Sequence, residues 1–440
     1  MARPSRSRTP DTPPAFLFAT GVENSNPTIQ NGRRRVDEME SCGHYARWRE
    51  DFECVQQLGI PFLRYGPPLY RTHLGPGRYD WTFADETFAD LHRRGLMPIV
   101  DLCHFGVPDW IGDFQNPDFP RLFAAYAGAF AQRFGWVQLY TPINEMFICA
   151  LFSGRLGWWN EQLASDRGFV TALKHIVRAN VLAMQAILKV RPDALFVQSE
   201  SSEYFHAEDP AAIKPAEIRN AERFLSLDLN YGRRVDSEMY EFLTDNGMTR
   251  SEYRFFLEND CRHNCILGND YYVTNEHRVS SENQTSPAGE VFGYCEITRE
   301  YHRRYRLPVM HTETNFWQGP AGDEAVRWLW KEWANVLRLR NDGIPIIGFT
   351  WYSLTDQIGW ECQLRDPIGI PNPVGLFDLD RRLRPVGEAY QKLIAAWRTV
   401  LPTQSLCLSV PLDMPLPSEP DAELSSQQHR RRASPRAGLT

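Results

Sequence analysis

The sequence predicts a single large (β/α)8 barrel, and three observations lead to that prediction. From Phe16 onward, eight short apolar runs alternate with longer amphipathic runs. No Gly-rich phosphate-binding fingerprint follows the first apolar run, which argues against a doubly wound sheet. Hydrophobic residues make up 42 % of the 440 positions, enough for the core of a barrel of this length.

The predicted strands are the short apolar runs, and the predicted helices are the amphipathic runs between them. The strands cover residues 16–18, 62–65, 97–102, 137–140, 194–197, 265–268, 308–310 and 346–350. The helices cover residues 46–58, 82–94, 120–134, 169–190, 219–246, 290–305, 323–342 and 390–400. Glycine and proline follow the helices that end near 58, 94 and 190, as expected where a chain turns back into a strand.

One domain is therefore expected from residue 15 to 401. Residues 1–14 are mostly Pro, Ser, Thr and Arg, and we expect this N-terminal segment to be disordered. Residues 402–440 are rich in Pro, Ser, Gln and Arg and have few large apolar side chains after Leu416. Such a segment buries too little apolar surface to fold, so a disordered C-terminal tail is predicted.

Charge and cysteine content exclude several classes of partner. The chain carries 48 basic and 55 acidic residues, for a net charge of −7, and its basic runs are short Arg triplets near the two ends, so nucleic acid is not expected as a partner. No stretch approaches the roughly 20 apolar residues of a membrane helix, and the apolar piece after the N-terminus is too short for a secretory signal. Nine scattered cysteines do not form a disulfide framework, so a cytoplasmic location is expected.

Two glutamates follow predicted strands at the end where barrel enzymes place their active sites. Asn144-Glu145 comes after the fourth strand, and Glu313 comes after the seventh. Cleaving an acetal requires a proton for the leaving oxygen and a group that captures or stabilises the oxocarbenium-like carbon. Paired carboxylates do both when their surroundings separate their pKa values. The pair therefore predicts the cleavage of glycosidic bonds.

Several short motifs share one family resemblance and fall in order along nearly the whole of residues 16–397. The chain resembles glycoside hydrolase family 1, the β-glucosidase family of retaining barrel enzymes. The motifs that carry the resemblance are Leu63-Arg-Tyr65, Leu102-Cys-His-Phe105, the helix from Phe123 to Gly135 with Thr141-Pro-Ile-Asn-Glu145, Leu267-Gly-Asn-Asp-Tyr-Tyr272, His311-Thr-Glu-Thr-Asn315, Trp351-Tyr-Ser-Leu-Thr-Asp356 and Val374-Gly-Leu-Phe-Asp378.

The resemblance implies a role for each matching residue. Glu145 would be the general acid/base and Glu313 the nucleophile that forms a covalent glycosyl intermediate. Asn144 would hold the sugar 2-hydroxyl beside the nucleophile. Arg64 and Tyr272 would contact Glu313 and keep it ionised.

The resemblance also implies residues that bind the sugar ring. His104 would bind hydroxyls, and Trp351 would provide the stacking platform. Strand alternation favours Tyr272 over Tyr271 as the partner of Glu313, because Tyr272 is two residues after Asp270 and points the same way.

The chain departs from the family pattern where the sugar and its leaving group are recognised. Asp270 stands where an Asn is common, so the leaving-group side is expected to differ, and Met146 replaces the usual Pro. Before Trp360, which is expected to bind substrate, the family has a Glu that clamps the sugar, whereas here Gly359 precedes Trp360 and the acid comes after it as Glu361. Either Glu361 replaces the missing clamp and binds the sugar, or sugar recognition is altered. The loop between Trp351 and Trp360 also counts one residue longer than in the family. The usual Gln near the first strand has its best substitute in Glu23.

The predicted function is a retaining β-glycosidase that hydrolyses β-linked glucosides or related small β-glycosides. Two alternatives stay open: a transglycosidase that uses the same two glutamates, and a non-catalytic sugar-binding barrel. No cofactor is expected, and no metal either, because Cys261, His263 and Cys265 supply three ligands where a structural zinc site needs four. Glu200 and Glu203 are expected to form an exposed pair after the fifth strand.

Overall fold

The structure, a computed structural model, describes residues 16–319, 321–401 and 412–417. Eight parallel strands close into a barrel in which β1 pairs with both β4 and β15. These strands are β1 (Leu17–Gly21), β4 (Phe62–Tyr65), β7 (Met97–Asp101), β8 (Leu139–Thr141), β9 (Leu195–Ser201), β11 (Cys265–Asp270), β14 (Val309–Glu313) and β15 (Ile346–Trp351). The predicted (β/α)8 barrel is confirmed.

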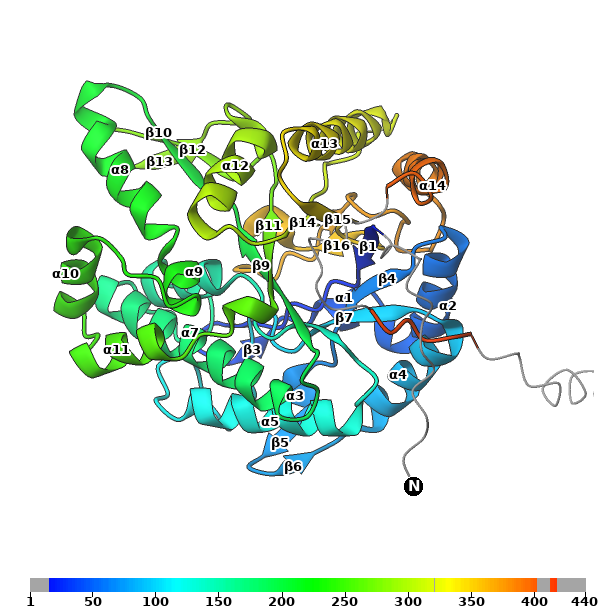
Figure 1. Cartoon of the computed structure of the whole chain (residues 1–440), viewed down its shortest axis with the longest axis horizontal. Coiled ribbons are helices and arrows are strands. Elements are labelled where there is room, and N and C mark those ends of the chain that lie inside the picture. The colour runs from blue at the N-terminus through cyan, green and yellow to red at the C-terminus, as the bar shows by residue number, and fades with distance from the viewer. Residues whose placement is uncertain (1–15, 320, 402–411, 418–440) are drawn as a thin grey trace, which may run out of the picture.

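Helices surround the barrel (Figure 1). The long ones are α2 (His44–Gln57), α4 (Thr82–Arg94), α5 (Phe119–Arg133), α7 (Asp166–Leu188), α12 (Gly293–Tyr305), α13 (Asp323–Asn341) and α14 (Pro385–Trp397). The single helix predicted over 219–246 is wrong, and the structure has α8 (Ile213–Glu222), α9 (Leu225–Asn230), α10 (Ser237–Asp245) and α11 (Arg250–Glu258) in this region. The side chains of Asp236 and Thr249 cap the starts of α10 and α11, so local capping signals divide the apolar pattern.

Shorter elements follow the strands and shape the mouth of the barrel. After β8 comes α6 (Met146–Ala150), and after β15 come β16 (Gln357–Ile358), a 3-10 turn (Trp360–Cys362) and β17 (Pro371–Asn372). A small sheet of β10 (Tyr204–Ala207), β12 (Glu276–Val279) and β13 (Thr285–Pro287) lies beside α8, away from the barrel (Figure 1). The remaining pieces are α1 (Glu38–Ser41), α3 (Leu69–Thr72) and the two-stranded ribbons β2 (Thr28–Ile29) with β3 (Arg34–Arg35) and β5 (His73–Gly75) with β6 (Arg78–Tyr79).

Strand alternation divides the core into an interior and an outer layer. On β4, Phe62 packs with the interior cluster, while Leu63 and Tyr65 pack in the outer layer with the helices. Arg64 has the same parity as Phe62 and is 2 % exposed, so its charge is buried inside the barrel mouth. This placement makes Arg64 the centre of the polar network described below.

Part of the C-terminal segment contacts the barrel. Leu412 is buried among interior residues such as Phe62 and Leu139, and the side chain of Arg191 lies 3.0 Å from that of Asp413. For residues 412–417 this differs from the expected disorder, because Leu412 buries apolar surface against the barrel. The other residues predicted to be disordered, including all of 1–14, lie outside the described residues.

Candidate functional site

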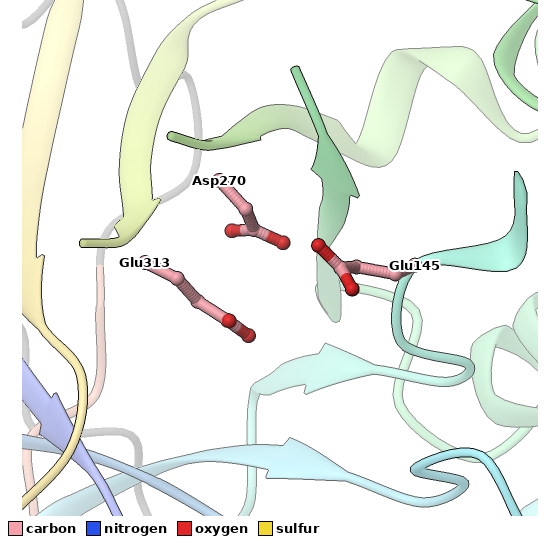
Figure 2. A group of neighbouring side chains, drawn as sticks. All are labelled: Glu145, Asp270 and Glu313. Atoms are coloured by element: carbon pink, nitrogen blue, oxygen red, sulfur yellow. The ribbon is translucent and has the colours of Figure 1, made fainter. Parts of the chain in front are cut away.

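Three carboxylates converge at the C-terminal ends of the strands. Asp270 is the last residue of β11, Glu313 is the last residue of β14, and Glu145 lies between β8 and α6. One carboxylate oxygen from each lies within 4.8 Å of the others (Figure 2). The backbone of Glu145 is left-handed, with φ 39°, and this conformation turns the chain from the strand into α6. The two glutamates singled out in the sequence are therefore neighbours in space.

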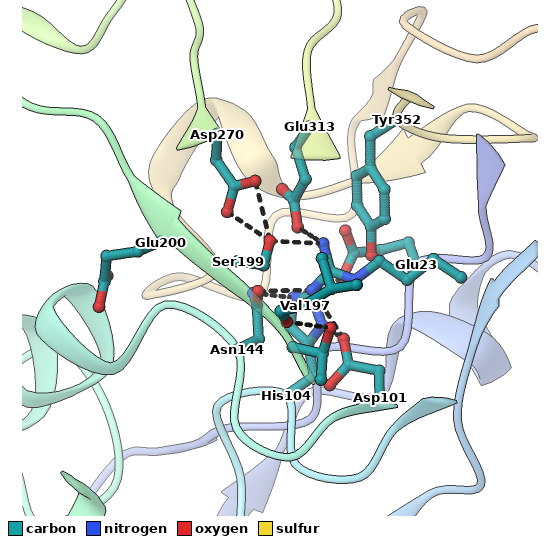
Figure 3. Close-up of polar contacts among 12 residues, drawn as sticks. Glu23, Asp101, His104, Asn144, Val197, Ser199, Glu200, Asp270, Glu313 and Tyr352 are labelled. Carbon is teal, nitrogen blue, oxygen red and sulfur yellow. Dashed lines mark hydrogen bonds and ion pairs between the residues drawn. The ribbon is translucent and has the colours of Figure 1, made fainter. Parts of the chain in front are cut away.

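Arg64 connects the residues of the site, and its partners Asp101, Asn144, Ser199 and Glu313 are labelled in Figure 3. Its guanidinium donates to Glu313, to the Ser199 hydroxyl at 3.0 Å, and to Asp101 at 2.8 Å. It also donates to the Asn144 side-chain oxygen. A buried guanidinium is stable only with such partners, so Arg64 and its two carboxylates form one unit.

His104 and Asn144 are held in fixed orientations by the same network. The Asn144 oxygen accepts from Arg64, so its nitrogen is the donor to His104 Nε2 at 3.0 Å. His104 Nδ1 then carries the proton and donates to Asp101 at 2.8 Å. The chain thus presents an amide and an imidazole beside Glu313 with their hydrogen-bonding directions defined.

The two central glutamates have opposite surroundings. Glu313 accepts from Arg64 and from the Tyr272 hydroxyl, which is 2.7 Å away, whereas the Tyr271 hydroxyl donates to Glu276. Burial, followed by the carboxylates of Asp270 and Glu313, raises the pKa of Glu145 well above its usual range. One acid is supplied with donors and the other has a raised pKa, which is the separation that acid-assisted substitution requires.

The aromatic residue that faces this site is Tyr352, and the expectation for Trp351 is wrong. Phe349 and Trp351 share one parity of β15 and pack in the outer layer, where the Trp351 indole donates to the Val374 carbonyl at 2.9 Å. Tyr352 points inward, its ring stacked 6.3 Å from that of His104. Counted from Tyr352 to Trp360, the loop no longer has an extra residue.

A glycine makes room for the Tyr352 ring. A Cβ on Gly21, at the end of β1, would lie 2.2 Å from a ring carbon of Tyr352. Any side chain there would displace the ring from the site. The register of β15 shifts near its start, where Ile347 packs in the interior although it has the parity of Phe349 and Trp351, so sequence parity alone does not identify Tyr352.

The residues expected to bind the sugar differ in their burial and in their contacts with the network around Arg64. Glu23 is buried, accepts from Ser25 and from Gln357 Nε2 at 3.1 Å, and lies 3.8 Å from His104 Nε2. Trp360 is partly buried, with its ring 6.2 Å from that of Phe105. Glu361 is exposed and accepts from Asn372 at 3.1 Å, so it does not join the hydrogen-bonded network.

Asp101 and Ser199 belong to the site although the sequence did not single them out. Both have the parity of interior residues, Asp101 after Ile99 on β7 and Ser199 after Val197 on β9. Glu200 and Glu203 are also buried, which corrects the expectation of an exposed pair. Glu203 contacts His277, and Glu200 accepts from the backbone N–H of Phe147 in α6 at 3.2 Å.

The carboxylate cluster has the spacing of a cation site. Within the part of the chain that the structure describes, Glu145, Asp270 and Glu313 are the one group with the geometry of metal ligands. Donors from Arg64, Tyr272 and Ser199 already occupy oxygens of Glu313 and Asp270. The cluster is therefore organised by hydrogen bonds between acids and donors.

Glu200 gives a prediction for the pH dependence of stability. Burial raises its pKa to about 7, above the roughly 4.3 of an unfolded chain. A raised pKa contributes stability that is complete below pH 4.3 and is lost as the pH rises through 7, by up to about 3 kcal/mol. The free energy of unfolding, measured with urea, should therefore fall less between pH 5 and pH 8 in Glu200→Gln than in the wild type. Glu241→Gln, on an exposed part of α10, is the control and should lose as much as the wild type; equal losses in all three proteins would contradict the prediction.

No helix among the described residues has the length and apolar character needed to cross a membrane.

Comparisons with known proteins agree on one family. The model of glycosyl hydrolase family 1 matches residues 26–234, a range that contains Arg64, Asn144 and Glu145 and ends before β11. β-Glucosidase A of Thermotoga maritima is 26 % identical over 199 residues, which are 43 % of this chain and 44 % of that protein. Cytosolic β-glucosidase of Homo sapiens is 23 % identical over 416 residues, or 80 % of this chain and 86 % of that protein.

The solved structures extend the agreement to the fold. A β-glucosidase from Thermotoga maritima in complex with a calystegine derivative aligns with a TM-score of 0.74 at 17 % identity, covering 87 % of this chain and 98 % of that one. At this identity the alignment concerns the fold, and the sequence matches concern the family. The order of the motifs, the family match over residues 26–234 and the closed barrel together support a divergent member of glycosyl hydrolase family 1.

Proposed function

We propose that this protein is a retaining β-glycosidase that hydrolyses β-linked glucosides or related β-glycosides. Glu145 protonates the leaving oxygen while Glu313 attacks the anomeric carbon, and Glu145 then activates the water that releases the sugar. Asn144 binds the 2-hydroxyl, with His104 and Glu23 on neighbouring hydroxyls and Tyr352 against the face of the ring. The family match and the β-glucosidase relatives support a glycosidase.

The observation that carries the mechanism is the separation of the two glutamates. Their nearest carboxylate oxygens lie within 4.8 Å. Retaining enzymes hold their carboxyl groups about 5 to 5.5 Å apart, whereas inverting enzymes need roughly 6.5 to 9.5 Å to fit a water molecule between acid and sugar. The donors on Glu313 and the raised pKa of Glu145 support the proposed roles of nucleophile and acid.

Trapping the intermediate tests the mechanism. A 2-deoxy-2-fluoro-β-glycoside with a good leaving group should inactivate the enzyme by forming a slowly hydrolysed ester. Peptide mass spectrometry should then locate the sugar on Glu313. A label on any other residue would reject the nucleophile, and multiple turnovers on a panel of aryl β-glycosides would exclude a protein that only binds sugar.

The charges of the site predict discrimination against phosphorylated sugars. The 6-phospho-β-glucosidase AscB of Escherichia coli is 26 % identical over 165 residues. In this chain, however, Arg64 is already paired with Glu313 and Asp101, and the loop from Tyr352 to Trp360 contains no Lys or Arg. Arg365, the next cation, is exposed and pairs with Asp366.

A buried phosphate without a partner is costly, so the kcat/KM for a 6-phosphorylated aryl β-glucoside should be at least about 100-fold below that for the unphosphorylated compound. Both rates are measured with the same chromogenic leaving group. Equal rates, or a preference for the phosphorylated sugar, would contradict this assignment of the charges.

A further inference from the structure

Asp270 adds a third carboxyl group to a site in which the proposed mechanism uses two. It is fully buried, and one of its oxygens lies within 4.8 Å of those of Glu145 and Glu313 (Figure 2). Carboxylates at this separation cannot all ionise without cost, because like charges in a buried site disfavour each other's charged forms. Which of the three carboxyl groups holds a proton therefore decides which of them can act as an acid.

Hydrogen bonds to Asp270 indicate that it is held as an acceptor. The Ser199 hydroxyl lies 2.8 and 2.7 Å from the two Asp270 oxygens (Figure 3). Arg64 donates to that hydroxyl at 3.0 Å, so the oxygen of Ser199 is an acceptor on the side of Arg64, and its own proton turns toward Asp270. Arg64 thus supports a negative charge on Asp270 through Ser199.

The remaining titratable neighbours of Asp270 and Glu145 come from several elements. Around Asp270 they are Glu313 of β14, Tyr272 after β11 and Tyr294 of α12, in addition to Arg64 and Glu145. Around Glu145 they also include Glu200 and Glu203. Burial and the Glu313 carboxylate raise the pKa of Asp270 well above its usual range as well, and Arg64, Thr312 and Ser199 oppose that rise. Of the two acids, Asp270 is the one supplied with donors, which leaves the proton to Glu145.

We propose that Asp270 is a positioning residue for the acid/base step, and that its negative charge keeps the proton on Glu145 into a more alkaline range than Glu313 alone would allow. This inference rests on the proposed function of Glu145 and Glu313. Its consequence is an enzyme whose leaving-group protonation persists at higher pH than in a variant with an uncharged residue at position 270.

The test is the pH dependence of kcat/KM for two aryl β-glucosides, one with a poor and one with an activated leaving group. With the poor leaving group, the alkaline limb of Asp270→Asn should move to lower pH by about one unit, because a like charge has been removed from beside the acid. Ser199→Ala should move the limb in the same direction by less, since the proton then shifts toward Asp270. The activated leaving group needs little protonation and should show a much smaller shift in both variants.

Asp366→Asn is the matched control, because it removes the same charge from an exposed loop position. Its alkaline limb should coincide with that of the wild type. An alkaline limb that stays in place, or moves upward, in Asp270→Asn would overturn the proposal while leaving the glycosidase mechanism intact. If Asp270→Asn does not fold, an unmoved limb in Ser199→Ala has the same meaning.

Thermal unfolding gives a readout that does not depend on turnover. Glu145 has a raised pKa in the folded protein, so its contribution to stability is present at low pH and is lost as the pH rises. Asp270→Asn should lose less of this stability as the pH rises. The Tm of the variant relative to the wild type should therefore increase steadily from pH 5 to pH 8. A constant difference in Tm would overturn the coupling, whereas normal coupling without turnover of any β-glycoside by the wild type would instead reject the proposed function.

Discussion

Glu313→Ala is expected to lower kcat for aryl β-glucosides by at least about four orders of magnitude, because the substitution removes the carboxylate that captures the anomeric carbon. Arg64 and Tyr272 would then face an empty space next to the sugar. Azide is small enough to occupy it and should restore turnover. The product should be the α-glycosyl azide, formed by one displacement from the face on which Glu313 lies, and its configuration is read by NMR.

The exposed Glu388 of α14 provides the control for this experiment, since Glu388→Ala removes a carboxyl of the same size far from the network. Its rates should equal those of the wild type, with or without azide. A β-configured azide from Glu313→Ala would assign Glu313 to the acid/base role instead. Unchanged hydrolysis would remove it from the mechanism altogether.

The placement of Glu145 and Glu313 followed from topology alone. In a barrel of parallel strands all carboxyl ends meet at one mouth, so two acids after the fourth and seventh strands had to be near each other. Strand alternation explains why Arg64 lies inside with Phe62, but its contact with Glu313 was expected from the family resemblance. The placement of the two glutamates depends only on which strand each of them follows.

The rest of the site depends on contacts between residues far apart in the sequence. Ser199 matters because Arg64 and Asp270 reach it from two other strands, and no local pattern around position 199 reveals this. Glu200 is expected to be exposed because it is charged and follows a predicted strand, yet it is buried within β9, where it accepts from the start of α6. The resemblance placed the stacking role on Trp351, whereas the register shift at the start of β15 turns Trp351 outward and Tyr352 into the site.

Glu145→Ala is expected to lower kcat/KM by about 10² to 10⁴ for substrates with poor leaving groups, the range that general acid catalysis contributes. An activated dinitrophenyl glucoside should still form the intermediate at nearly the wild-type rate, because its leaving group departs without a proton. The second step then lacks its base, so the intermediate should accumulate and give a burst of dinitrophenol. Stopped-flow absorbance measures the burst.

Azide distinguishes Glu145 from Asp270, the other acid within reach of the leaving oxygen. In Glu145→Ala, azide should attack the intermediate from the opposite face to Glu313 and give the β-glycosyl azide. Asp270→Asn keeps Glu145 and its proton, so azide should neither accelerate it nor form a glycosyl azide. If the two variants exchanged these behaviours, Asp270 would be the proton donor and Glu145 the residue that controls it. The opposite result assigns the proton to Glu145 and agrees with the donors that Ser199 and Arg64 supply to Asp270.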